Sequence, residues 1–262
     1  MIDTHTHTKF SFDAKSSIEE MITKAQEMGI EYYAISDHCD YDYNYIKKYI
    51  FMRRIRLKKY IKKVTEMKEK YPFLALGIEL GYSKKAQKDY FEKLHFDDYD
   101  YIINSTHTVD RNDCYFTAYF KNKDKNTAYM RYFEKVYRSL DASYPYQTIS
   151  HIGYVRKNAP YEDATINYLD YKDVIDKILK KIIALDKCLE INTNTKNKGI
   201  LPEREIIEKY YELGGRKISY ASDAHSVDRI CEGYEDVAKM VKEIGFEYWT
   251  VFRKQLPILI KI

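Results

Sequence analysis

The sequence has little that would place it outside the cytoplasm. Its four cysteines are far apart and form no CxxC pair, so free, reduced thiols are expected. The amino terminus has no apolar signal segment, because Asp3 and His5 interrupt it at once. No run approaches the ~18 apolar residues that a membrane span needs. We therefore expect a cytoplasmic protein with no membrane segment.

A linker rich in proline, glycine or serine is also missing, and no low-complexity tract occurs. The chain has 262 residues, of which 45% are hydrophobic and 32% charged. This balance is typical of a soluble globular protein with a large core, and the length suits one α/β barrel. We therefore predict a single domain over residues 1–262.

Several catalytic motifs are absent. There is no GxSxG nucleophile turn, no GxxxxGK[ST] phosphate loop and no GxGxxG dinucleotide motif, and no cysteine carries a nucleophile signature. Serine or cysteine hydrolysis and nucleotide-driven or dinucleotide chemistry are therefore not expected.

The charge is nearly balanced, with 44 basic and 40 acidic residues and a net charge of +4. One segment departs from this balance, because residues 47–70 hold eleven Lys or Arg and two Glu. Its apolar residues recur mostly at helical spacing. The segment is interpreted as a long surface helix with a solvated basic face, or alternatively as a platform for polyanions.

Short apolar runs alternate with amphipathic segments along the chain. The capping pair Ser16 and Glu19, followed by Gly29, delimits the clearest helix. Further helices are expected at about 46–70, 84–94, 126–142, 170–186, 203–213 and 232–244. Strands are expected at 2–4, 32–36, 74–79, 101–104, 148–150, 188–191 and 218–221. Seven strands alternating with helices predict a mainly parallel sheet that forms an incomplete β/α barrel.

Six of the seven histidines fall at or just after the carboxyl end of a predicted strand, where β/α barrels carry their active sites. They are His5, His7, His38, His107, His151 and His225. His5 and His7 are two residues apart, so on an extended segment both point the same way and can hold one metal. Asp223 and His225 repeat this spacing after the last strand of the barrel.

Two further carboxylates join this set. Glu79 ends a buried apolar strand, where a carboxylate needs a cation or strong hydrogen bonds. Asp13 lies six residues after His7, in the first loop from strand to helix. Nine imidazole and carboxylate ligands suit Zn, Fe, Mn or Co and exceed what one site can use. We therefore expect two or three metals, an arrangement typical of phosphate ester hydrolysis.

The pattern of these residues resembles the PHP (polymerase and histidinol phosphatase) family, most closely its stand-alone histidinol-phosphatases. The resemblance covers almost the whole chain. It is carried by DTHTH at 3–7, Asp13, SDH at 36–38, GIEL at 77–80, STH at 105–107, SHIGYVRK at 150–157, LEINT at 189–193 and SDAH at 222–225.

The resemblance implies a distorted (β/α)7 barrel that holds three divalent metal ions (Zn, Fe or Mn). Among the ligands, Glu79, His107 and Asp223 are expected to act in catalysis. The nine residues resemble three ligand sets, two of which share Glu79: His5, His7, Glu79 and Asp223; Glu79, His107 and His151; and Asp13, His38 and His225.

Four basic residues are candidates for binding the phosphate, two of them as alternatives to each other. Arg156 matches an arginine of the histidinol-phosphatase pattern and could bind phosphate in a bidentate way. The arginine expected near the LEINT strand is missing, and Lys198 or Lys196 could replace it. Arg111, after His107, is another cation within possible reach.

The implied function is hydrolysis of L-histidinol phosphate in histidine biosynthesis, with a hydroxide that bridges two metals attacking phosphorus. The expected partner is therefore a small phosphate monoester, and nucleic acid is not expected. One alternative is another PHP phosphoesterase, acting on phosphotyrosine or on nucleic-acid phosphates. A second is a PHP domain with a structural or regulatory role. The oligomeric state is left open.

Overall fold

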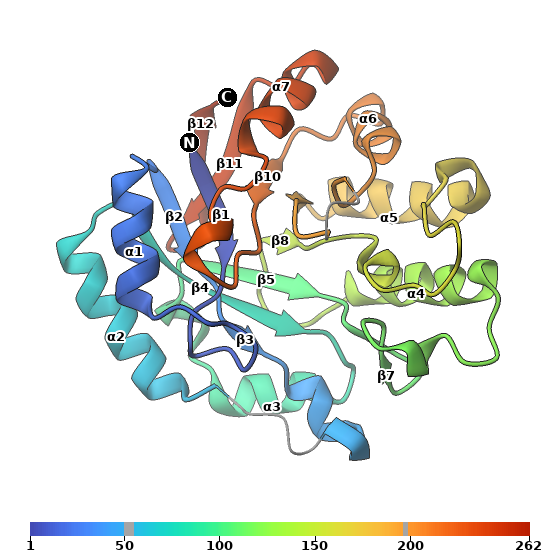
Figure 1. Cartoon of the computed structure of the whole chain (residues 1–262), viewed down its shortest axis with the longest axis horizontal. Helices are drawn as coiled ribbons and strands as arrows, with labels where there is room; N and C mark the ends of the chain where they lie inside the picture. Colours follow the sequence, from blue (N-terminus) through green and yellow to red (C-terminus); the bar gives the residue numbers. More distant parts are fainter. Residues whose placement is uncertain (50–54, 196–198) are drawn as a thin grey trace.

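A computed structural model describes residues 1–49, 55–195 and 199–262 (Figure 1). Its centre is a parallel sheet in which consecutive strands are neighbours, and all seven predicted strands are present. Their order is β1 (Ile2–Thr6), β2 (Tyr32–Ile35), β4 (Leu74–Gly81), β5 (Tyr101–Ser105), β8 (Thr148–Ile149), β9 (Cys188–Asn192) and β10 (Ile218–Ala221). The short strand β3 (His38–Cys39) pairs with β4.

The sheet curves until its first and last strands meet. The amide of Asp223 donates to the carbonyl of His5, and the amide of His7 donates to the carbonyl of Ala224, both at 2.8 Å. These bonds join the carboxyl ends of β1 and β10. The prediction of a distorted seven-stranded barrel is thereby confirmed.

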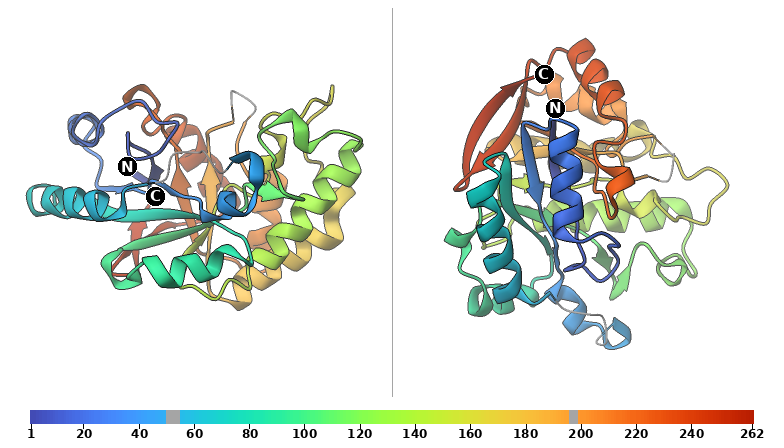
Figure 2. Two further views of the ribbon diagram at one scale, coloured as in Figure 1. Left: turned by 90° about the horizontal axis from the view of Figure 1, so that it is seen from below. Right: turned by 60° about the vertical axis from the view of Figure 1, so that its left-hand side comes forward.

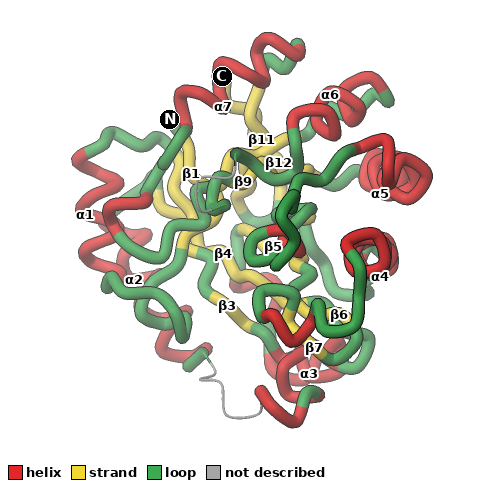
Figure 3. The backbone as a smooth tube through the Cα atoms, turned by 45° about the vertical axis from the view of Figure 1, so that its right-hand side comes forward, coloured by secondary structure: helices red, strands yellow, loops and turns green. Residues whose placement is uncertain are grey.

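Helices surround the strands on the outside (Figure 3). The α-helices are α1 (Ile18–Glu27), α2 (Leu57–Lys70), α3 (Ala86–Lys93), α4 (Lys125–Ser139), α5 (Lys172–Ala184), α6 (Arg204–Glu212) and α7 (Tyr234–Ile244). The 3₁₀ helices are Tyr41–Tyr45, Lys47–Tyr49, Phe96–Asp98, Thr117–Tyr119, Tyr154–Arg156, Tyr168–Tyr171 and Val227–Arg229. Within the described residues, no helix has the length and apolar character that crossing a bilayer requires.

Two local predictions were wrong. The capping box of α1 is formed by Ser17 and Glu20, one residue later than predicted, with bonds between side chain and backbone in both directions. The helix expected over 46–70 begins at Leu57. Ile46 has extended backbone angles (φ −120°, ψ 104°), which end the helical path after Tyr45. Residues 50–54 of that prediction lie outside the described residues.

Two antiparallel hairpins were not predicted. One is short and formed by β6 (Thr108–Val109) and β7 (Asn112–Asp113). The other ends the chain and is formed by β11 (Tyr248–Arg253) and β12 (Leu256–Lys261). The second hairpin packs at the amino ends of the barrel strands, where the hydroxyl of Tyr32 donates to the carbonyl of Phe252 at 2.6 Å.

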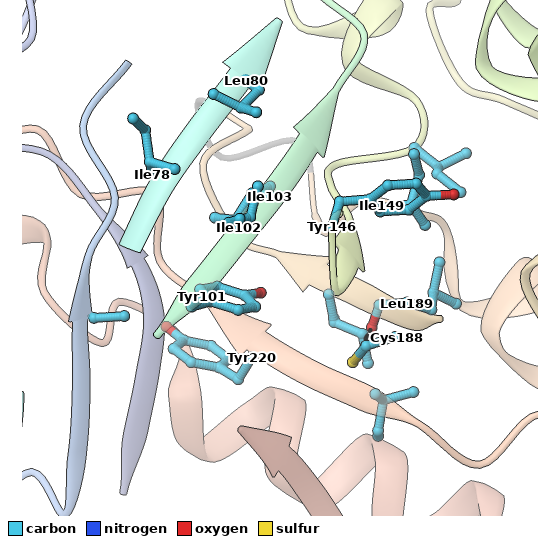
Figure 4. Close-up of a cluster of buried hydrophobic side chains, with 14 of the residues drawn as sticks. Ile78, Leu80, Tyr101, Ile102, Ile103, Tyr146, Ile149, Cys188, Leu189 and Tyr220 are labelled. Carbon is cyan, nitrogen blue, oxygen red and sulfur yellow. Dashed lines mark hydrogen bonds between the residues drawn. The ribbon is translucent and has the colours of Figure 1, made fainter. Parts of the chain in front are cut away.

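The core lies between the strands and their helices, and Figure 4 shows part of it around Ile78, Ile102, Ile103 and Leu189. Strands of a parallel sheet are covered on both faces, so their residues are apolar in continuous runs. All four cysteines are free, as expected, and all four are buried. A rigid barrel of this kind fixes the positions of the side chains at its strand ends.

Candidate metal centre

All nine predicted metal ligands lie together at the carboxyl end of the barrel strands. They border or lie beneath a cavity of about 400 Å³. Parallel strands end at one edge of a sheet, so residues far apart in the sequence meet there. We call these nine residues the ligand cluster: His5, His7, Asp13, His38, Glu79, His107, His151, Asp223 and His225.

Glu79, at 1% exposure, lies at the centre of the cluster. Its Oε1 atom is 3.1 Å from His107 Nε2 and 3.0 Å from His151 Nε2. Its Oε2 atom is 2.7 Å from His38 Nδ1 and 3.3 Å from His5 Nε2. The two oxygens of one carboxylate therefore face two different groups of imidazoles.

The electrostatics keep this carboxylate ionised. Burial alone would raise the pKa of Glu79, but the imidazoles of His38, His5 and His107 outweigh it and hold the pKa well below its usual value. Burial, with the charges of His225 and His38, lowers the pKa of His7 to about 3. His7 is therefore a neutral imidazole at pH 7, and a neutral imidazole is the form that binds metals.

The first strand is tied to the last strands of the barrel through its histidines. His5 Nδ1 lies 2.9 Å from Glu190 Oε2, on β9, which leaves His5 Nε2 facing the cluster. His7 Nε2 is 3.1 Å from Asp223 Oδ1, which follows β10. The second oxygen of Asp223 accepts from Lys157 Nζ at 2.9 Å.

Asp13, His38 and His225 form the outer part of the cluster. Asp13 Oδ2 is 3.3 Å from His225 Nε2 and 3.8 Å from His38 Nε2. Asp13 is 39% exposed at its side chain, whereas Glu79 is buried. This group therefore lies nearest to solvent, at the mouth of the cavity.

Two residues of the ligand cluster have a strained backbone. His151 has φ +23° and Asp223 has φ +51°, and residues other than glycine rarely adopt such positive φ angles. Each such residue costs of order 1–3 kcal/mol and persists where the surrounding structure imposes it. At His151, Glu190 Oε1 accepts from the backbone amide at 3.0 Å and helps to hold this conformation.

The donor set fits divalent cations. Within the described residues, several buried polar atoms of the cluster lie close to charged neighbours but make no contact with the geometry of a hydrogen bond, which buried polar groups normally have. They include His5 Nε2, His7 Nε2, His38 Nδ1, His107 Nδ1 and Glu79 Oε2. Three overlapping groups hold donor atoms within 4.8 Å of one another: His7, His38 and His225; His5, His7 and Glu79; and His38, Glu79 and His107.

Two carboxylates of the centre were not found from the sequence. Asp40 lies 3.1 Å from His38 Nδ1 and 3.3 Å from His107 Nδ1, and the missing Cβ of Gly81 leaves room for it. The sequence feature that could have indicated Asp40 is its two-residue spacing from His38, which equals the spacing between His5 and His7. The sequence indicates Glu190 only weakly, as a carboxylate inside an apolar strand. That feature does not predict its contact with His5.

Two of the predicted phosphate-binding residues, Arg156 and Arg111, do not line the cavity. The buried guanidinium of Arg156 pairs with Glu203, with Nε 2.7 Å from Oε1, and donates to the carbonyl of Ile200 at 2.9 Å. Arg111 is exposed in the turn of the β6–β7 hairpin. Lys196 and Lys198 lie outside the described residues. The roles of all four stay predictions.

Lys157, the neighbour of Arg156, lines the cavity instead. It is the one lysine or arginine among the described residues that form the cavity wall. Its exposure is 6%, and its Nζ contacts Asp223. Lys157 was not predicted from the sequence. Spacing alone cannot decide which of the adjacent cations Arg156 and Lys157 faces the cavity when the conformation of the turn that holds them is unknown.

The wall facing the cluster is aromatic and acidic. Tyr154 packs its ring 5.1 Å from that of His107 and 5.0 Å from that of His151. Its hydroxyl lies 3.3 Å from Asp113 Oδ1, and Tyr43 donates to Asp113 Oδ2 at 2.6 Å. Phe12, Tyr115 and Phe116 also line the cavity.

Comparison with known proteins agrees with this geometry. The family model described as "PHP domain" matches residues 3–194, which is most of the chain. The chain belongs to the PHP domain family.

Curated relatives of this PHP protein align with nearly its whole length. A "Probable histidinol-phosphatase" of Clostridium acetobutylicum is 30% identical over 98% of both chains. A protein with the same description from Thermotoga maritima is 30% identical over 98% of this chain and 97% of its own length. Among solved structures, a histidinol phosphate phosphatase of Lactococcus lactis in complex with Zn, L-histidinol and phosphate matches with a TM-score of 0.86. It shares 20% identity over 98% of both chains and supports the fold.

Removing metal should lower the stability of this PHP protein. A ligand that binds only the folded state at about 100 times its dissociation constant contributes about 2.7 kcal/mol. We therefore expect chelation to lower the midpoint of thermal unfolding and readdition of Zn²⁺ or Mn²⁺ to restore it. Differential scanning calorimetry with metal analysis of the same samples would measure this.

The matched variants are Glu79→Gln and Glu66→Gln. The second changes an exposed carboxylate on α2 that is not part of the ligand cluster. Glu79→Gln should bind fewer metal equivalents and respond less to added metal, while Glu66→Gln should behave as the parent protein. Equal metal content in the two variants would contradict the assignment of Glu79.

Proposed function

We propose that this PHP protein is a histidinol-phosphatase that hydrolyses L-histidinol phosphate to L-histidinol and inorganic phosphate. The observation that carries the proposal is the alignment of relatives named probable histidinol-phosphatase with 98% of the chain. The ligand cluster beside a cavity of substrate size is consistent with this chemistry. We further propose a single cytoplasmic domain over residues 1–262, with three divalent ions of Zn, Fe or Mn.

The two faces of Glu79 support a shared-ligand arrangement. We propose that Oε2 belongs to one site with His5, His7 and Asp223, and that Oε1 belongs to a second site with His107 and His151. The third site consists of Asp13, His38 and His225. Divalent ions held by these residues would supply Lewis acidity toward phosphoryl oxygens and would lower the pKa of a water that attacks phosphorus.

The protein supplies orientation and charge. Glu190 holds the ring of His5 with Nε2 toward the cluster, as carboxylates beside metal-binding histidines do. Lys157 places a buried positive charge on the cavity wall, where it can attract the substrate phosphate and the charge that develops on its oxygens. Because Lys157 also contacts Asp223, its ammonium is held in place before substrate binds.

The opposite wall suits the rest of the substrate. L-Histidinol phosphate carries an ammonium group and a planar imidazole. We propose that the carboxylate of Asp113 receives the ammonium, while the surrounding aromatic rings pack against the imidazole. Tyr154 spans the two halves of the cavity, because its ring contacts His107 and its hydroxyl reaches Asp113.

Substrate profiling tests the proposal directly. The metal-loaded protein should hydrolyse L-histidinol phosphate with a kcat/KM at least about 100-fold above that for a phosphotyrosine peptide or an oligonucleotide, because polar groups of the site are left unpaired by the wrong substrate. Steady-state phosphate release would measure it. A higher kcat/KM for either of the other two would favour the alternative phosphoesterase. Activity that survives complete metal removal would contradict the scheme.

Replacement of Lys157 should reveal its role. Lys157→Met is expected to lower kcat/KM by about 10²–10³, the effect of removing one group that stabilises transition-state charge. Lys157→Arg should retain more activity because it keeps the charge. Metal content must be measured in both variants, since Lys157 contacts Asp223. A Lys157→Met variant with full metal content and near-parental activity would contradict this role.

The same series tests the sequence-based prediction for Arg156. Its pairing with buried Glu203 leads us to expect that Arg156→Gln mainly lowers stability, by about 1–3 kcal/mol, because it leaves a buried group without its partner. Chemical denaturation would measure that loss. A loss of activity without a loss of stability would instead support phosphate binding by Arg156.

Replacement of Asp113 should change specificity. Asp113→Asn is expected to raise KM for L-histidinol phosphate by about tenfold, the loss of roughly one charged contact of 1.4 kcal/mol. Its kcat/KM for p-nitrophenyl phosphate should stay near that of the parent, because this ester has no ammonium group. A parallel loss on both substrates would show that Asp113 acts through structure or metal binding.

A further inference from the structure

The outer edge of the C-terminal hairpin is exposed and apolar. Strands β11 and β12 lie at the margin of the molecule, in dark red in the right-hand view of Figure 2. Most of β11 is buried, but β12 exposes Leu256 (68%), Leu259 (61%) and Ile258 (43%). Exposed apolar edge strands are sites where another strand can add to a sheet.

The hydrogen bonds of the hairpin show which groups of β12 point outward. The amide and carbonyl of Phe252 are both bonded to the hydroxyl of Tyr32, so they point away from β12. Phe252 lies opposite Pro257. In an antiparallel pair, opposite residues both point toward each other or both point away. The carbonyl of Pro257 therefore faces away from β11. Because this direction repeats at every second residue, the backbone amides and carbonyls of Leu259 and Lys261 face away from β11 as well.

A hydrogen bond at the other end of the hairpin shows the same alternation of inward and outward backbone groups along β12. Ile262 donates its amide to the carbonyl of Glu247 at 3.0 Å, so the even-numbered residues of β12 are those that face β11. By the same alternation, the amides of Leu259 and Lys261 point away from β11. The outer edge of β12 therefore offers two donors and three acceptors in a row.

We propose that β12 pairs antiparallel with β12 of a second copy of this chain, around a two-fold axis at Leu259. In this register each Leu259 amide donates to the Leu259 carbonyl of the other copy. Each Lys261 amide donates to the opposite Pro257 carbonyl. Pro257 lacks an amide hydrogen, so the carbonyl of the opposite Lys261 receives no hydrogen bond from it. This missing bond falls at the two ends of the paired strands, where water can donate to the carbonyl instead.

The side chains of β12 fit their own copy in this register. Leu259 faces Leu259, and Ile258 faces Ile260, so exposed apolar groups cover each other. Lys261 faces Pro257 and lies four strand positions from the other Lys261, about 13 Å away at 3.3–3.4 Å per residue. No like charges meet.

A neighbouring register, centred on Ile260, is less favourable. It would bring the two Lys261 side chains to within two strand positions on one face, and like charges at that range repel. It would also leave Leu256 uncovered, since the strands would overlap over fewer residues. Charge and apolar coverage thus both favour the pairing at Leu259 over the pairing at Ile260. The fit of β12 to its own copy in this register is what points to a second copy as the occupant of the edge.

The hairpin is far from the ligand cluster. It packs against the amino ends of the barrel strands, where the amide of Gln255 donates to the carbonyl of Asp100 at 2.9 Å, whereas the cluster lies at the carboxyl ends. Dimerisation here leaves the cavity open on each copy. The inference is independent of the proposed phosphatase activity, and variants of this edge should keep their metal content.

Sedimentation equilibrium of the full chain tests the dimer. An interface of one strand pair is small, so we expect dissociation in the micromolar range. The mass should be twice 31.4 kDa at a protein concentration of about 100 μM and should fall on dilution to about 1 μM. Leu259→Lys and Leu259→Glu should each be monomeric at the higher concentration, because like charges face each other at the axis.

The decisive sample is an equimolar mixture of these two variants, which should dimerise because Lys and Glu then face each other. Leu169→Lys is the control, as it places a lysine at another exposed leucine (72%) outside the hairpin, and it should dimerise as the parent does. A monomeric parent protein at about 100 μM, including one whose edge captures a different protein, would overturn the proposal. So would a dimeric Leu259→Lys variant or a mixture that stays monomeric.

Discussion

The buried carboxylate of Glu79 is the constraint around which this structure is organised. An ionised carboxylate in a barrel interior is strongly unfavourable unless cations or several hydrogen-bond donors surround it. Here the imidazoles of four histidines approach its two oxygens, and each comes from a different strand end. The barrel makes this possible because parallel strands bring their carboxyl ends to one place. The same convergence defines the metal centre.

Much of this could be predicted because the relevant signals are local. A two-residue spacing on an extended segment decides that His5 and His7 share a side, and short apolar runs locate the strands without knowledge of their neighbours. The barrel strands and the convergence of the cluster follow from such patterns and from the topology of parallel sheets. Asp40 has the same two-residue spacing from His38. It follows a strand of only two residues, however, and no apolar run in the sequence predicts that strand.

The features that were missed depend on contacts between distant residues. Arg156 and Lys157 are adjacent, yet a 3₁₀ turn directs one toward Glu203 and the other toward Asp223. Nothing near them in the sequence specifies which cation reaches the cavity. The C-terminal hairpin is similar, since its position is set by Tyr32, 220 residues away from Phe252. The late start, at Leu57, of the helix predicted over 46–70 has a different cause, because it reflects local backbone angles that apolar spacing does not encode.

Glu190 shows why a strand that contributes no residue to the ligand cluster is still part of the centre. One oxygen of its carboxylate holds the ring of His5, and the other accepts the amide of His151, whose backbone is strained. One buried charge therefore orients groups that we assign to both sides of Glu79. Removing it would release the His5 ring and a backbone turn at once, so its effect on the two proposed sites cannot be the sum of separate effects. Positioning of this kind requires a closed barrel, because β9 reaches His5 only where the sheet has curved back to its first strand.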